Sequence, residues 1–253
     1  MDEQTNTGRI RAMTGFSLKV TACAAMLGDH IAKGLHLTGL PLWILSHLAG
    51  RIAFPLFCFL LAEGYFCTSN VRKYTLRVLI LGVLSEPLFD LALHGTVFFP
   101  DAQNTCFTLA LGLILFSLLD RIRESCHGDY RKSGALQAAS ILIFALAASL
   151  LKTDYGALGI GALAAFYLGR AHECGTRTHR PFPTIEWSFF SYLAACMILN
   201  LDGFSEPAAF LSVPVILMYN GRQGFHSRAV RNAFYLFYPL HLALLILLEQ
   251  IAG

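Results

Sequence analysis

Residues 50–68, G-R-I-A-F-P-L-F-C-F-L-L-A-E-G-Y-F-C-T, form an apolar stretch long enough to cross a lipid bilayer. The stretch nevertheless carries Arg51 near its start and Glu63 toward its end. A charge at membrane depth costs about 2.5–3.5 kcal/mol even on a lenient insertion scale, so such side chains normally face a protein interior or a water-filled cavity. Pro55 predicts a kink, because its ring removes a helical hydrogen bond and crowds the preceding turn. The pattern is typical of a spanning helix that has a second task.

The composition of the whole chain agrees with a membrane setting. Of the 253 residues, 55% are hydrophobic and only 14% are charged, whereas soluble domains carry about 25% charged residues. So few polar side chains cannot cover a soluble globule, and we expect one integral membrane domain over residues 1–253. The net charge of +3 predicts no nucleic-acid partner, because the basic residues fall in short loops between apolar runs.

A spanning helix needs about 20 apolar residues, and the chain offers about nine such runs. We therefore predict an all-α, polytopic transmembrane helix bundle of about nine transmembrane helices, in contact with membrane lipid. The predicted spans are residues 16–35, 48–67, 74–94, 104–120, 134–151, 154–169, 186–201, 206–220 and 232–250.

The distribution of basic residues predicts the orientation. If the N-terminus is cytoplasmic, the segments on the inner side hold most of the 19 Lys and Arg residues, and the outer segments hold only Lys33 and Lys152. Cytoplasmic loops are enriched in Lys and Arg, so we expect a cytoplasmic N-terminus and, for a bacterial protein, a multi-pass place in the inner membrane.

Asp29-His30 is the most informative polar pair on the predicted outer side. Histidine takes and returns a proton near neutral pH more readily than any other side chain, which makes His30 a candidate general base with Asp29 as its orienting acid. The structural alternative is a histidine that caps a helix end or is hydrogen-bonded to a carbonyl. The adjacent acid and the nearby Arg51 favour a functional role.

Arg51 admits two interpretations, which are not exclusive. It can bind a phosphate or carboxylate, or stabilise a developing oxyanion. It can also hold helices together by pairing with Glu86, Asp90 or Asp29. Glu86 and Asp90 lie four residues apart on one helix face, which favours a structural network for these two acids.

Two further motifs remain open between function and structure. Asn104 and Thr108 can donate hydrogen bonds to a reacting carbonyl oxygen or serve as contacts between helices. Asp154-Tyr155-Gly156 is typical of a tight helix start with Asp154 as the N-cap. The seven cysteines show no metal-ligand spacing, and we predict no metal site.

Several short blocks of the sequence resemble those of one known family. K-V-T-A-C-A-A-M-L-G-D-H-I from Lys19, the stretch from Gly50, and N-T-C-F-T-L-A-L-G from Asn104 resemble the TraX family. K-Y-T-L-R from Lys73, D-Y-G-A-L-G-I from Asp154 and F-Y-L-F-Y-P-L-H-L from Phe234 resemble it too, in the family's order. Only the region of about 170–230 is poorly matched.

The resemblance implies a membrane acetyltransferase, because the family is named for a protein that acetylates the N-terminus of pilin. It implies acetyl-CoA as the donor on the cytoplasmic side and an amine or hydroxyl acceptor, on a protein or a glycan, on the other side. His30 would be the base, assisted by Asp29, with Arg51 and Asn104 stabilising the oxyanion. The residues expected to bind the cofactor at the inner side are Arg72, Arg77, Tyr238, His241 and Glu63.

Two other classes of protein remain as alternatives. A secondary transporter or proton-coupled permease also places Asp, His and Arg at membrane depth, but such proteins often show internal repeats, and none is visible here. The second alternative is a non-catalytic assembly factor whose polar residues serve only helix packing.

Overall fold

The computed structural model describes residues 12–34, 40–126, 128–174, 185–202 and 206–252. In these ranges the chain is helical, and its only β pairing consists of two isolated bridges. The predicted cytoplasmic tail, residues 1–11, lies outside the described residues. The elements are α1 (Gly15–Gly34), α2 (Leu40–Cys67), α3 (Val71–His94), α4 (Thr105–Ser125), α5 (Tyr130–Leu150), α6 (Gly156–Cys174), α7 (Ile185–Leu199), η1 (Asn200–Asp202), η2 (Glu206–Leu211), α8 (Ser212–Leu217) and α9 (Arg228–Ala252).

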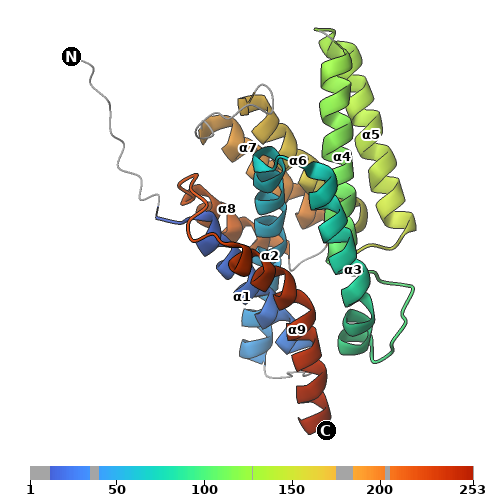
Figure 1. The fold of residues 1–253 in the computed structure, drawn as a ribbon, viewed down its shortest axis with the longest axis vertical. Helices are drawn as coiled ribbons and strands as arrows, with labels where there is room; N and C mark the ends of the chain where they lie inside the picture. Colours follow the sequence, from blue (N-terminus) through green and yellow to red (C-terminus); the bar gives the residue numbers. More distant parts are fainter. Residues whose placement is uncertain (1–11, 35–39, 127, 175–184, 203–205, 253) are drawn as a thin grey trace, which may run out of the picture.

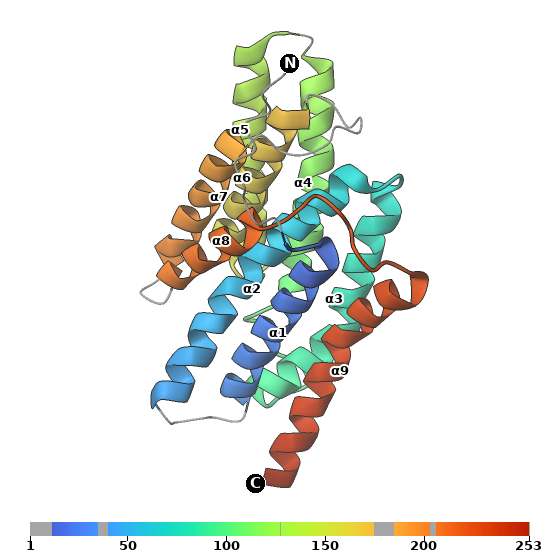
Figure 2. The same cartoon turned by 90° about the vertical axis from the view of Figure 1, so that its left-hand side faces the viewer.

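Helix α2, which contains the opening stretch, is the central element of the bundle. It packs against α1, α4, α6, η2 and α8, and Figure 2 shows it between α1 and the α6–α8 region. Its helical structure continues through Pro55. Its apolar side chains, among them Leu56, Phe59 and Tyr65, are buried in the hydrophobic core. The same segment that is long enough to span a membrane therefore also organises the protein interior.

The other helices surround α2 in two groups. Helix α9 packs against α3 and α1, and α3 packs against α4. Helices α4 and α5 stand side by side as a long hairpin (Figure 1), and α5 also packs against α6, which packs against α7. The arrangement brings the C-terminal helix α9 back to the N-terminal helix α1, which matters for the site described below.

Side-chain caps determine where several helices begin. Asn70 accepts a hydrogen bond from the Lys73 backbone N–H at the start of α3, and Asp129 accepts one from the Lys132 N–H at the start of α5. Each cap satisfies one of the backbone donors that a helix N-terminus leaves without an intrahelical partner. Gly95 ends α3 in the left-handed conformation, with φ of 69°, which glycine adopts without steric cost.

The all-helical membrane class is confirmed, while the predicted set of spans needs correction. Among the described residues, four segments are long and apolar enough to cross a membrane, namely Gly50–Cys67, Thr105–Ser125, Tyr130–Leu150 and Arg228–Ile251. The predicted span 206–220 is wrong as a single helix. It consists of the six-residue η2 and the six-residue α8, which are too short to cross. The number of crossings and the side of the N-terminus stay predictions.

Candidate functional site

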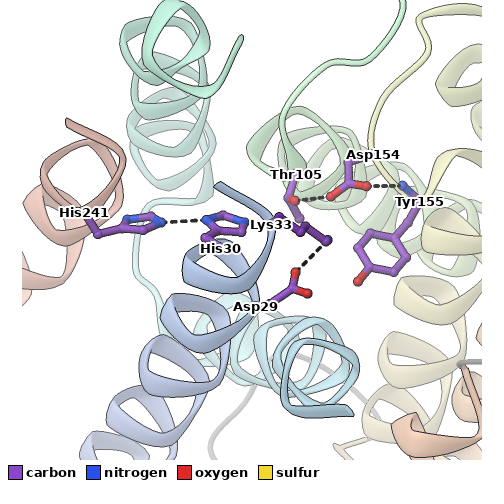
Figure 3. Close-up of polar contacts among 7 residues, drawn as sticks. All are labelled: Asp29, His30, Lys33, Thr105, Asp154, Tyr155 and His241. Atoms are coloured by element: carbon purple, nitrogen blue, oxygen red, sulfur yellow. Dashed lines mark hydrogen bonds and ion pairs between the residues drawn. The ribbon is translucent and has the colours of Figure 1, made fainter. Parts of the chain in front are cut away.

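The two histidines His30 and His241 meet inside the bundle. His30 lies in the last turns of α1 and His241 in the middle of α9, and their side chains are only 8% and 4% exposed. His30 Nδ1 lies 2.7 Å from His241 Nε2, and the two rings are nearly parallel, with an interplanar angle of 16° and centroids 5.0 Å apart. Figure 3 shows the contact joining the two helices. The second nitrogen of His241, Nδ1, lies 2.9 Å from the backbone oxygen of Phe237.

This contact corrects the predicted location of His241. The sequence predicts His30 at the outer side and His241 at the inner side, among the cofactor-binding residues. The structure brings them into direct contact because α9 packs along α1. His241 therefore belongs to the same site as His30, and its sequence position gave no signal of this partnership.

Asp29 does not orient His30. Its carboxylate pairs with Lys33 at 2.7 Å, and Figure 3 shows it directed away from the His30–His241 contact. Successive residues of a helix point about 100° apart because a turn contains 3.6 residues, so adjacency in sequence separates these two side chains. The i,i+4 spacing of Asp29 and Lys33 was the signal for the ion pair that does form.

Arg51 and Lys33 lie on the same side of the site as Asp154. Both cations are close enough to Asp154 to interact with its carboxylate electrostatically. Thr105 donates a hydrogen bond to that carboxylate, and Thr108 donates one to the Asp154 backbone oxygen. These hydrogen bonds link Asp154 to the start of α4, which lies far from it in sequence. The polar residues of this paragraph therefore extend from α1 and α2 to α4 and the start of α6.

The acids Glu86 and Asp90 have other partners than the predicted Arg51. Glu86 Oε2 accepts hydrogen bonds from the backbone N–H and the side-chain amide of Asn104. Asp90 Oδ2 accepts one from the Phe99 backbone N–H at 2.8 Å. Glu86 Oε2 and Asp90 Oδ2 are thus bound by neutral donors between α3 and α4 and not, as predicted, by the guanidinium of Arg51.

Asn104 has a structural task in this arrangement. It is fully buried, and its side-chain oxygen caps α4 by accepting from the Cys106 N–H at 2.9 Å. Its amide nitrogen donates to the Gly82 oxygen at 2.9 Å and to Glu86. Both amide hydrogens are therefore engaged, and neither is free to stabilise an oxyanion as predicted. Asn104 instead connects α3 with α4.

Four buried polar atoms have no hydrogen-bond partner in the part of the chain that the structure describes. They are Ser85 Oγ, Glu86 Oε1, Asp90 Oδ1 and Tyr238 Oη. An unsatisfied buried polar group costs about 1–3 kcal/mol, so such atoms usually have a functional or solvent partner. Tyr238 interacts electrostatically with Cys106, Asp154 and Glu86, which associates its hydroxyl with the polar residues of α3, α4 and α6.

The predicted cofactor-binding residues do not form one group. Arg72 and Arg77 are exposed in the first turns of α3, whereas Tyr238 and His241 lie with His30. Glu63 forms a buried ion pair with Arg170 of α6, with Nε and Oε1 2.5 Å apart. Arg170 was not predicted as this partner. The available signal was that a charge in an apolar span requires a counter-charge, but nothing in the sequence specified which one.

Polar contacts also connect α2, α4 and α6 near Glu63. The hydroxyl of Tyr65 donates to one oxygen of Asp120, and the hydroxyl of Tyr167 donates to the other. Since both carboxylate oxygens are satisfied, this cluster is a packing element rather than a binding site. Elsewhere too, in the ranges that are described, no three His, Cys, Asp or Glu side chains converge as metal ligands.

An all-helical bundle with apolar spanning helices and a buried histidine pair defines an integral membrane protein with a polar site in its interior. The chain belongs to the TraX family: residues 15–249 match the family described as "TraX protein". The predicted resemblance is thereby confirmed, and the match also includes residues 170–230, where the sequence blocks resemble the family poorly. A relative from Dichelobacter nodosus, "Probable fimbrial assembly protein FimC, serogroup H1", is 32% identical over 253 residues, covering 92% of this chain and 94% of that protein. No solved structure matches the chain.

Proposed function

We propose that this protein is an acetyltransferase of the bacterial inner membrane. It moves the acetyl group of cytoplasmic acetyl-CoA to an amine or hydroxyl acceptor on the extracytoplasmic side. Membership of the TraX family supports this reaction class. The name of the Dichelobacter relative refers to fimbrial assembly, which supports a pilin subunit or another surface component as the acceptor.

The observation that carries the proposal is the buried contact between His30 and His241. Burial beside a second imidazole keeps His30 neutral, and a neutral imidazole has the lone pair that a general base needs. In the proposed reaction His30 removes a proton from the acceptor, the acceptor atom attacks the thioester carbon, and the carbon–sulfur bond breaks. The leaving CoA thiolate then receives the proton from His30.

Arg51 is the proposed stabiliser of the tetrahedral oxyanion. It is partly buried in α2, near Asp154 and near the end of α1 that carries the base. In well-studied acyl-transfer enzymes, losing one oxyanion donor costs about 3–4 kcal/mol, or 100- to 1000-fold in rate. The exposed Arg72 and Arg77 are the proposed contacts for the CoA phosphates, because guanidinium groups bind phosphate oxygens in a bidentate manner.

The unpartnered oxygens favour an amine over a hydroxyl as the acceptor. Glu86 Oε1 and Asp90 Oδ1 are carboxylate atoms without a donor among the described residues. An ammonium group offers three donors and a positive charge, whereas a sugar hydroxyl offers one donor and no charge. In this proposal the two carboxylates stabilise the acceptor as it arrives as an ammonium group. One of them takes the extra proton of that group, which leaves a neutral amine whose next proton goes to His30.

The experiment is an acetyl-transfer assay on the purified protein in lipid nanodiscs. Release of CoA thiol is measured with acetyl-CoA and a short peptide, with either a free or a blocked N-terminal amine. We expect turnover with the free amine, loss of at least 100-fold in His30→Ala, and wild-type turnover in His226→Ala, which changes an exposed loop histidine. A folded His30→Ala protein with full turnover would show that His30 is not the base.

A binding measurement separates the enzyme from the transporter alternative. A ligand that binds only the folded state stabilises it in a saturable way, so acetyl-CoA should raise the unfolding temperature of the nanodisc sample. Absence of any stabilisation at millimolar acetyl-CoA, together with absence of turnover, would overturn the acetyltransferase proposal.

A further inference from the structure

A backbone carbonyl determines which nitrogens of the histidine pair donate hydrogen bonds and which accept them. The Phe237 oxygen, 2.9 Å from His241 Nδ1, has no proton and can only accept. The hydrogen of that bond must therefore reside on His241 Nδ1. In a neutral imidazole one nitrogen donates and the other accepts, so His241 Nε2 carries a lone pair.

The proton of the next contact is then determined as well. Since His241 Nε2 accepts, His30 Nδ1, 2.7 Å away, must donate. The only remaining nitrogen of the pair, His30 Nε2, has a lone pair and no hydrogen. This nitrogen forms no hydrogen bond with any of the described residues, so its lone pair is available to a substrate.

In the reverse assignment His241 Nε2 would donate to His30 Nδ1, so both nitrogens of His241 would carry a proton. The surroundings of the ring disfavour this charged form. A doubly protonated ring would place a positive charge in a nearly fully buried site. Neither ring is hydrogen-bonded to a carboxylate, and the charged side chain that acts on His30 is the cation Lys33. Two positive charges in one buried region repel each other, so the neutral pair is the favoured resting state.

We infer that His241 is a positioning residue that holds His30 in the tautomer with its lone pair on Nε2. The chain of contacts from the Phe237 carbonyl through His241 makes His30 Nε2, rather than Nδ1, the proton acceptor. Orienting a catalytic histidine through its second nitrogen is a general requirement of base catalysis, usually met by a carboxylate. Here a neutral imidazole performs that task, which leaves no additional charge in the membrane interior.

The catalytic use of this tautomer rests on the proposed function. When the acceptor loses its proton, the proton goes to His30 Nε2, and the acceptor atom forms its bond to the acetyl carbon. When the carbon–sulfur bond breaks, the same proton passes from Nε2 to the CoA sulfur. His241 transfers no proton in either step, and its Nε2 lone pair stabilises the transient His30 imidazolium through the Nδ1–H bond.

The test reads the tautomer directly, without any substrate. Nitrogen NMR of protein labelled with 15N-histidine in nanodiscs distinguishes protonated from unprotonated ring nitrogens, and comparison with His30→Gln assigns the His30 signals. We expect His30 with a protonated Nδ1 and an unprotonated Nε2. A wild-type spectrum with the proton on His30 Nε2 overturns the inference, whatever the protein's activity.

Two variants of His241 separate positioning from packing. His241→Gln keeps an acceptor oxygen on α9, whereas His241→Leu keeps the bulk and removes the acceptor. In His241→Leu we expect mixed tautomers of His30 and a 10- to 100-fold fall in kcat with little change in KM for acetyl-CoA. His241→Gln should keep the wild-type tautomer and kcat within about fivefold.

The outcomes distinguish this inference from the proposed function. Equal rates in His241→Leu and His241→Gln, or an unchanged His30 tautomer in the leucine variant, would refute the positioning role. If the wild type shows the expected tautomer but no acetyl transfer under any condition, the pair is assigned correctly and the proposed reaction is wrong. Should His241→Leu not fold, the wild-type spectrum alone still decides the tautomer.

Discussion

Gly50 is the position where a single added methyl group should disturb the candidate site most directly. An ideal Cβ at Gly50 would lie 2.4 Å from Asp29 Cγ and 2.5 Å from Asp29 Cβ, whereas ordinary van der Waals contacts begin near 3.4 Å. In Gly50→Ala the end of α1 must therefore move by about 1 Å relative to α2, the difference between those values. Rotating the Asp29 side chain alone is insufficient, because its Cβ is fixed to the helix backbone.

The expected size of the effect follows from this displacement. Overpacking a tight contact typically costs about 1–3 kcal/mol in stability. A misplacement of about 1 Å at a catalytic group can cost about 100-fold in rate, and His30 adjoins the displaced residue. We therefore expect Gly50→Ala to lower the unfolding free energy by about 1–3 kcal/mol and to lower acetyl transfer by at least tenfold.

The control is Gly134→Ala, on the outer helix α5. Apart from the backbone of its own helix turn and its chain neighbours, nothing lies within 4 Å of an ideal Cβ at Gly134. Alanine there should therefore be neutral, or stabilising by up to about 1 kcal/mol through helix propensity. Stability is measured by unfolding in mild detergent, and activity by CoA release in nanodiscs. If Gly50→Ala is as stable and as active as Gly134→Ala, the close packing of α1 on α2 does not position the site.

Three further predictions concern the polar contacts inside the bundle. Arg170→Leu removes the counter-charge of the Glu63 carboxylate, whose side chain is only 11% exposed, and should lower the free energy of unfolding by about 3–5 kcal/mol. The double variant Glu63→Leu/Arg170→Leu should recover most of that loss. Unfolding measurements in which the two single losses simply add would contradict a buried pair. Asn104→Ala removes the cap of α4 and the amide that binds the Glu86 carboxylate, so it should lower the free energy of unfolding by about 2–3 kcal/mol. Asp129→Ala, at the exposed cap of α5, should lower it by about 1 kcal/mol. Equal losses in the two variants would argue against a role of Asn104 in connecting α3 with α4. Tyr238→Phe removes a hydroxyl that has no partner among the described residues, so the unfolding temperature should stay unchanged. The apparent Kd for acetyl-CoA should rise about tenfold, because one hydrogen bond to the ligand is lost. An unchanged Kd would exclude contact between this hydroxyl and acetyl-CoA.

Reasoning from sequence was most successful where a residue's own chemistry determines its surroundings. The low content of charged residues required a membrane setting, and the described helices confirm that class. A charged residue in an apolar span, such as Glu63, was expected to face the protein interior, and Glu63 is buried. The order of several short sequence blocks identified the family without any structure, and the family match over residues 15–249 confirms it.

The same reasoning failed where it extended sequence proximity to spatial contact. Asp29 adjoins His30 in the chain, yet the helix turns the two side chains apart, and His30 contacts a residue on α9 instead. Asn104 had the donors expected of an oxyanion-stabilising residue, but those donors are consumed by Gly82 and Glu86. A hydrogen-bonding side chain reveals its capacity in the sequence, but only its neighbours decide whether that capacity is free.

The amino-acid sequence by itself determined that this protein is a helical membrane protein and that charged side chains in its spans need protected surroundings. These properties depend on the free energy of transferring single residues and single helices from water to lipid. Tertiary packing alone decided that α9 returns to α1, that His241 contacts His30, and that Arg170 neutralises Glu63. Such pairings depend on how whole helices fit against one another, which is a property of the assembled bundle and not of any segment within it.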